Sequence, residues 1–238
     1  MQERSHGSAL ILGVCILLGL ALLGYLVGSS ALKIKEFERS VTVKGLSERE
    51  YPADIVIWPI HFSAADNNLP ALYASMEKDA AIIKAFLQDK GFSQEEISTS
   101  PPQVTDKLAQ GYERSRIEFR YSASQAMTVY SRQIEEVRST MNTIADIGKQ
   151  GVALTSGGYQ ASTEYLFTRL NEVKPDMVEE ATNKAREVAQ KFAQDSNSRL
   201  GKIKRARQGQ FSISSRDKNN PHIKKVRVVS TIEYYLSD

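Results

Sequence analysis

The sequence predicts an α+β fold in which an N-terminal transmembrane helix precedes a domain of mixed or antiparallel strands with three main helices. One uncharged stretch at the N-terminus is long enough to cross a bilayer. After it, pairs of strand-like runs alternate with segments of helical periodicity, an order typical of the α+β class. With 238 residues, 41% of them hydrophobic and 25% charged, the chain has the composition of a globular protein with a core.

The N-terminal stretch contains no charged residue from Gly7 to Leu32. A helix needs about 20 apolar residues to cross the hydrocarbon core, whereas the apolar part of a secretory signal spans only about 7–15. We therefore expect a retained anchor that contacts the lipid bilayer. The predicted segments are a short tail, the transmembrane helix, a spacer and the α+β domain, at residues 1–8, 9–32, 33–40 and 41–238.

Two pairs of small residues in this stretch are relevant to its cleavage and to its packing against other helices. Ser29 and Ala31 form a small-x-small pair that a signal peptidase accepts, so cleavage remains an alternative. Gly24 and Gly28 form a GxxxG motif, which lets transmembrane helices pack closely. We select these two glycines as candidates for transmembrane packing, although a glycine-containing apolar stretch often shows the motif by chance.

Two strands are predicted directly after the spacer. Val41 and Val43 alternate with polar residues, as in a half-buried strand, and residues 54–64 are apolar on both alternating sides. The polar residues between the two runs predict a hairpin that begins the folded body. Pro59 has no N–H for a ladder hydrogen bond, so it indicates a sheet edge or a bulge.

Three helices and further strands complete the domain. The helical periodicity covers residues 69–90, 131–147 and 175–200. Strands are expected near Ile97, at 116–131, as a hairpin or strand pair at 151–170, and at 203–214 and 226–236. The predicted inner stripe of the third helix consists of Val178, Ala181, Ala185, Val188, Ala189 and Phe192.

Three stretches of the sequence resemble SIMPL-domain proteins. They are "VTVKGLSEREYPADIVIWPIHFS", "LQDKGFSQEEISTSPPQV" and "EEATNKAREVAQKFAQDSNSRLGKI", and their order and spacing also fit. The resemblance covers most of the chain from Val41 onward. Pro59 and His61 depart from the family pattern, as does the polar segment before the last strand.

The resemblance implies a periplasmic or secreted envelope protein with an α+β fold and without known catalytic residues. Some relatives form ring-shaped, channel-like oligomers, and some are linked to oxidative-stress tolerance. We therefore expect a self-assembling homo-oligomer that contributes to oxidative or envelope stress tolerance. Its expected location is the inner (cytoplasmic) membrane, as a single-pass protein with a periplasmic C-terminal domain.

The charges beside the apolar stretch favour the opposite orientation. Only Arg4 precedes the stretch, whereas Lys33, Lys35 and Arg39 follow it, and positive charges prefer the cytoplasmic side. The difference is small, and long domains cross the membrane largely regardless of charge. We retain the periplasmic orientation that the resemblance implies.

A search for catalytic chemistry selects no site. His6, His61 and His222 have no metal-site spacing, and Cys15 is the single cysteine. Nucleophile-elbow and phosphate-loop motifs are absent from the sequence. We interpret Asp54 as a polar residue at the start of a strand that caps or bonds a local turn, not as a general acid. The sequence thus predicts no catalytic residue, no cofactor, no metal and no enzymatic activity.

The C-terminal part of the chain is strongly basic. Between Arg199 and Arg227, ten Lys or Arg residues accompany one acidic residue, Asp217. Such a run is either a solvated face or a surface that contacts an acidic partner, and a neighbouring subunit is the partner we favour. Nucleic acid is not expected, because aromatic residues are not interleaved with the basic ones. The candidate contact residues are Lys202, Lys204, Arg205 and Arg207.

Two function classes follow from these observations. The first is a non-enzymatic, membrane-anchored envelope protein that assembles through its α+β domain, with no known small-molecule partner. The alternative is a small-molecule-binding protein or enzyme whose pocket forms between subunits. A deep pocket with convergent polar groups would favour the alternative.

Overall fold

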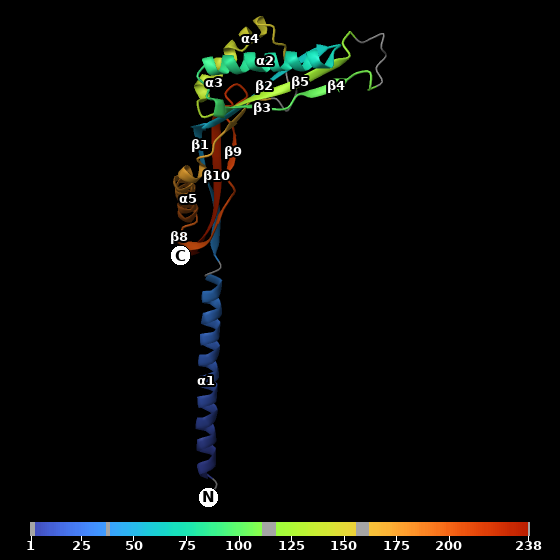
Figure 1. Ribbon diagram of the computed structural model, residues 1–238. Coiled ribbons are helices and arrows are strands. Elements are labelled where there is room, and N and C mark those ends of the chain that lie inside the picture. Colours follow the sequence, from blue (N-terminus) through green and yellow to red (C-terminus); the bar gives the residue numbers. More distant parts are fainter. Residues whose placement is uncertain (1–2, 37–38, 111–117, 156–161, 238) are drawn as a thin grey trace. The chain divides into compact units, whose positions relative to one another are not determined.

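The computed structural model describes residues 3–36, 39–110, 118–155 and 162–237 (Figure 1). Helices and antiparallel sheets follow the apolar N-terminal helix, so the predicted α+β class is confirmed. The chain forms two compact units that are each discontinuous in sequence. The first contains Met1–Glu48, Lys174–Phe211 and Arg227–Asp238, and the second contains Arg49–Val173 and Ser212–Val226.

The predicted transmembrane segment lies within a single long helix, α1 (Glu3–Glu36). Its stretch Leu10–Ser30 has a mean hydropathy of 2.8 and is long and apolar enough to cross a membrane. The helix also extends into the segments expected to be a tail and a spacer. Its length and composition fit a membrane anchor or a signal sequence.

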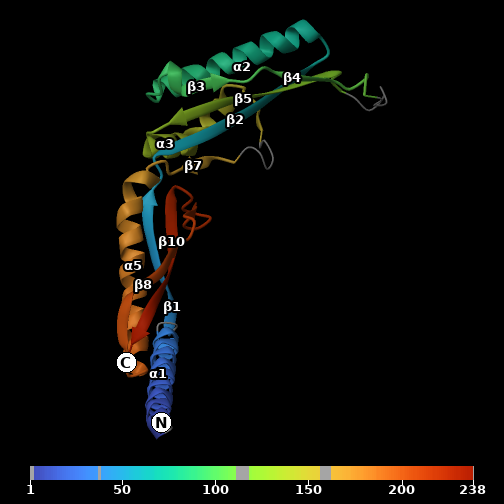
Figure 2. The same cartoon turned by 90° about the horizontal axis from the view of Figure 1, so that it is seen from below.

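One sheet is built from β1 (Ser40–Pro52), β10 (Ile223–Ser237) and β8 (Arg199–Gln208), in that order, with β9 (Ser212–Ser215) pairing to β10. The long helix α5 (Leu170–Asp195) runs alongside β1 and β10 (Figure 2). In the first unit, Val43, Ile232 and Tyr234 pack against the alanines of this helix.

The contact between α5 and β1 is close because small residues meet there, Gly45 on the strand and Ala181 and Ala185 on the helix. The buried side chains of α5 are Met177, Ala181, Ala185, Ala189 and Ala193. A Cβ atom added to Gly45 on β1 would overlap the carbonyl oxygen of Ala181 and lie 2.5 Å from the backbone nitrogen of Ala185. The helix backbone therefore rests directly on the strand backbone, a position that only glycine allows.

The predicted inner stripe of this helix is partly wrong. Val188 and Phe192 are exposed, with 38% and 54% of their surface accessible. Their bulk at the sheet would hold α5 away from Gly45, so the helix is rotated to place the alanines inward. Two apolar side chains are thereby left on the outside of the first unit.

The second unit contains a six-stranded antiparallel sheet with the order β3-β5-β2-β6, in which β4 pairs with β5 and β7 with β2. Its strands are β2 (Ile55–Asp66), β3 (Ile97–Thr99), β4 (Gln103–Asp106), β5 (Tyr121–Ser131), β6 (Leu154–Thr155) and β7 (Glu164–Leu166).

Helices α2 (Leu69–Asp89), α3 (Ile134–Thr143) and α4 (Ala145–Lys149) pack against this sheet's core, which includes Trp58, Ile60 and Phe62 (Figure 1). The Asn68 side chain caps α2 by accepting a hydrogen bond from the backbone N–H of Ala71 at 3.1 Å. A short 3-10 helix, Gln94–Glu96, follows α2.

Two predictions about the strands require correction. The expected opening hairpin is wrong, because β1 pairs with β10 and β2 pairs with β5 in the other sheet. Strand β2 is also central, not an edge. Its second side pairs with β7 at Ile55–Ile57 and with β6 at His61–Phe62, so Pro59 falls in the interval between these partners. Of the two alternatives predicted for 151–170, the strand pair is found, since β6 and β7 each pair with β2.

The helix boundaries agree to different degrees. The prediction of 69–90 matches α2 within one residue, whereas the predicted 131–147 helix is divided into α3 and α4. The predicted third helix, 175–200, begins and ends five residues too late. Asn197 adopts a left-handed conformation with a φ of 52°, and Ser198 N–H bonds to Ala193 O at 2.8 Å, which closes the helix before Gly201.

We expect Gly45→Ala to destabilise the protein by about 3 kcal/mol, the upper part of the usual overpacking range, because the colliding atoms belong to a helix backbone. Thermal unfolding of the detergent-solubilised full chain, followed by circular dichroism, measures the loss. Gly148→Ala is the matched control, since no atom of the described residues beyond the adjoining backbone lies within 4 Å of its added Cβ. This substitution should be neutral or stabilising. Equal effects of the two variants would contradict the close α5–β1 contact.

Candidate functional site

The four basic residues selected from the sequence lie on β8, the edge strand of the first unit's sheet. All residues of β8 except Leu200 are exposed. In the register with β10, Arg207 lies across from Thr231 and Arg205 across from Glu233. These residues therefore project from the sheet face opposite Ile232 and Tyr234, which contact α5.

A bulge in β8 concentrates charge around Glu233. The register shifts between Glu233 and Tyr234, which face Arg205 and Ile203, so Lys204 is an extra residue in the strand. Lys204 Nζ lies 3.0 Å from Glu233 Oε1 and 5.7 Å from the centre of the Tyr235 ring. Hydrogen bonds from Ser40 and Lys204 lower the pKa of Glu233. Lys204 is therefore already neutralised within the chain.

The other three basic side chains are available for contacts. Lys202, Arg205 and Arg207 are exposed, and none has an ion-pair partner within the described part of the chain. The structure thus leaves Lys202 and Arg207 as free cations, whereas Arg205 lies across from Glu233 and, like Lys204, lowers the pKa of its carboxyl group. This arrangement provides a localised positive edge, without a general acid or base partner.

Gly24 and Gly28 lie on α1, one helical turn apart. Apart from the adjoining backbone of α1 itself, no atom of the described chain comes within 4 Å of a Cβ added at either glycine. Both positions are open to a neighbouring helix.

Asp54 links two distant segments of the second unit. Its carboxylate accepts hydrogen bonds from the Thr168 backbone N–H at 2.9 Å and from the Thr168 hydroxyl at 2.7 Å. Arg169 Nε also lies 3.6 Å from Asp54 Oδ2. The interpretation of Asp54 as a local turn residue is therefore wrong, because its partner is 114 residues away.

A cavity of about 490 Å³ opens beside this carboxylate. It falls within the usual size range of ligand pockets, which is about 300–1,000 Å³. Sequence reasoning missed it, because its residues come from three separate stretches of the chain. The residues that line it are Asp54, Ile55, Arg132, Thr168, Arg169, Asn171 and Glu172.

The histidines do not form a metal centre in the described residues, where no group of three or more His, Cys, Asp or Glu side chains is suitably placed. His61 lies on β2, and its buried Nε2 has no hydrogen-bond partner among the described residues. His222 stacks edge-on against Tyr165 at 6.0 Å, and burial lowers its pKa.

Two buried charged residues were not selected from the sequence. Asp79 lies in the buried stripe of α2, and burial raises the pKa of its carboxyl group. Lys224 donates a hydrogen bond from Nζ to Ser215 Oγ at 3.0 Å, and burial lowers the pKa of its amine. A lysine beside a serine can activate the hydroxyl for acyl transfer. Ser215 stands exposed on the short strand β9, however, and does not line the cavity beside Asp54.

We expect Asp54→Ala to destabilise the protein by about 1.5–3 kcal/mol, because it removes a charged acceptor from the Thr168 N–H and hydroxyl. Asp54→Asn should cost less, since the amide oxygen still accepts one bond. Thermal unfolding measures both variants. Asp89→Ala, an exposed acid at the end of α2, is the control and should change stability by less than about 0.5 kcal/mol. An Asp54→Ala variant as stable as this control would show that the link is unimportant.

The comparison with protein families agrees with the motifs and the fold. The family described as "SIMPL: Protein of unknown function (DUF541)" matches residues 41–230, which span both compact units. None of the curated proteins matches the chain. The resemblance of the three sequence stretches is confirmed, and because the match covers most of the chain, the protein belongs to the SIMPL family.

Proposed function

We propose that this protein is a membrane-anchored, non-enzymatic envelope protein that works by self-assembly. It is retained in the inner membrane through α1, carries its SIMPL domain on the periplasmic side, and contributes to oxidative or envelope stress tolerance. The apolar stretch Leu10–Ser30 and the family membership support the anchoring and the envelope location. The stress role and the orientation rest on the family resemblance alone.

The observation that carries the proposal is the exposure of the edge strand β8. An edge strand presents unpaired backbone groups that pair readily with another chain. Ile203 on β8 and Phe192 on α5 are also exposed, at 42% and 54%. The first unit thus combines an open sheet edge with apolar side chains, which supports a contact surface.

The charge on β8 selects the kind of partner. Two β8 edges that met in a symmetric dimer would bring Lys202, Arg205 and Arg207 of both copies together, and like charges across strands are destabilising. The proposed contact therefore joins β8 to a different, acidic surface of the neighbouring copy. Such head-to-tail contacts form rings when the rotation closes. Gly24 and Gly28 add a proposed contact between neighbouring anchors.

The anchor predicts that the full-length protein resists extraction from membranes by alkaline carbonate. N-terminal sequencing should find the chain intact ahead of Ser29. Protease added to spheroplasts should digest the domain, because it faces the periplasm. A mature chain that begins just after Ala31 would overturn the anchor, and protection from the protease would overturn the orientation.

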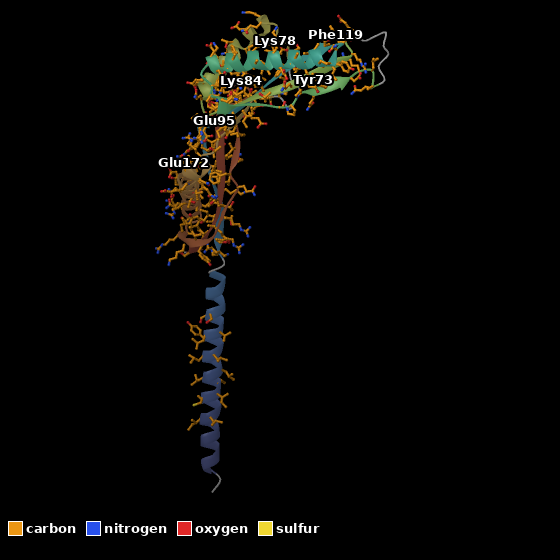
Figure 3. All side chains as sticks on the ribbon, viewed as in Figure 1. Tyr73, Lys78, Lys84, Glu95, Phe119 and Glu172 are labelled. Atoms are coloured by element: carbon orange, nitrogen blue, oxygen red, sulfur yellow. The ribbon has the colours of Figure 1, made fainter. Side chains whose placement is uncertain are left out.

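Reversal of the free charges on β8 should reduce the size of the assembly. We expect Lys202→Glu with Arg207→Glu to shift the detergent-extracted protein toward smaller oligomers by mass photometry, and high salt should act in the same direction. The matched control is Lys78→Glu with Lys84→Glu on α2 (Figure 3), which should leave the oligomer unchanged. Self-assembly through β8 would be contradicted if the wild type is a monomer. It would also be contradicted if the oligomer has the same size after the charge reversal and in high salt.

A further inference from the structure

Four charged side chains line the cavity beside Asp54. Two of them pair with each other, and the other two have no ion-pair partner among the described residues. Asp54 is already satisfied by the two bonds from Thr168 and by Arg169 at 3.6 Å. Arg169 also lies over the ring of Phe167 at 5.7 Å. This pair is therefore neutral, and it forms a fixed wall of the cavity.

These other two side chains are Arg132 and Glu172. Neither has a hydrogen bond or ion pair within the part of the chain that the structure describes, and they do not pair with each other. Arg132 directly follows β5, and Glu172, labelled in Figure 3, lies in the first turn of α5. One free cation and one free anion thus line the same cavity without touching.

Opposite charges that share a cavity but do not contact each other leave room for a molecule that carries both. A ligand with only a negative charge would be attracted by Arg132 but repelled by Glu172. A ligand with only a positive charge would be attracted by Glu172 but repelled by Arg132. A zwitterion satisfies both, because its carboxylate can accept two parallel hydrogen bonds from the guanidinium and its ammonium can donate to the carboxylate. The Asn171 amide lines the same cavity and offers both a donor and an acceptor.

We propose that this cavity binds a small zwitterion, an amino acid or a short peptide, with its carboxylate on Arg132 and its ammonium on Glu172. The cavity volume of about 490 Å³ is sufficient for a ligand of this size. The site lies wholly within the second unit, so it needs neither an oligomer nor the edge strand β8. The test of ligand binding at this site is therefore independent of the proposed self-assembly.

Four probes test the proposal on the detergent-solubilised full-length protein by isothermal titration calorimetry. The dipeptide Ala-Ala carries both charges and should bind saturably, with a Kd at or below ~1 mM. N-acetyl-Ala-Ala lacks the ammonium and Ala-Ala amide lacks the carboxylate, and each should bind at least ~10-fold more weakly. Inorganic phosphate should compete poorly, because it has no group for Glu172.

Two variants assign the charges to their residues. Arg132→Gln should weaken Ala-Ala binding by ~10-fold or more, and it should also abolish the difference between Ala-Ala and its amide. Glu172→Gln should weaken Ala-Ala similarly, and it should make N-acetyl-Ala-Ala an equal ligand. The exposed ion pair of α3 supplies matched controls, Arg138→Gln and Glu135→Gln, which should leave binding unchanged.

Several results would overturn the proposal. The first is that Ala-Ala does not bind, and the second is that the wild type binds Ala-Ala and its N-acetyl form equally. The third is that phosphate binds more tightly than Ala-Ala, which would indicate a simple anion site. Retention of full affinity by both cavity variants would exclude Arg132 and Glu172. The probe series on the wild type needs no substitution, so it decides the question even if a variant fails to fold.

Discussion

The backbone contact between α5 and β1 at Gly45 determines how the helix packs on the sheet of the first unit. A helix that rests on a strand without an intervening side chain needs a stripe of small residues, and Ala181, Ala185 and Ala189 supply it. Next to this contact, the fully buried Ser47 donates a hydrogen bond to Glu180 at 2.9 Å. Close contact also limits how much of the sheet the helix covers, so β8 remains exposed on both faces. The packing constraint thus produces the open basic edge.

Local signals in the sequence located the helices, although only the boundaries of α2 were predicted closely, and they were insufficient for the partners of the strands. Asn68 and Pro70 mark the start of α2, and its boundaries were predicted almost correctly. The pairing of β1 with β10 joins the two ends of the domain, and no local pattern specifies it. A hairpin was the natural local choice, because adjacent strands usually pair.

The candidate sites were predictable to the same limited extent. The basic character of β8 is visible in the sequence, but the bulge that lets Lys204 meet Glu233 depends on the register with β10. Asp54 was recognised as a polar residue at the start of a strand, whereas its bond to Thr168 across 114 residues is a tertiary contact. The cavity charges, Arg132 and Glu172, have no distinguishing pattern of their own, because each follows an ordinary element boundary.

Anchoring restricts the geometry that self-assembly can take. If every copy keeps its apolar stretch Leu10–Ser30 in one bilayer, successive copies cannot rise along a screw axis, because a translation along the membrane normal would pull anchors out of lipid. The remaining head-to-tail repeats are a rotation about the membrane normal and a translation within the membrane plane. A rotation gives a closed ring when a whole number of steps completes a full turn, whereas the same contact without anchors could continue as a filament. The proposed contact between a basic edge and an acidic surface, with every anchor in a single membrane plane, would therefore be compatible with a ring of finite size.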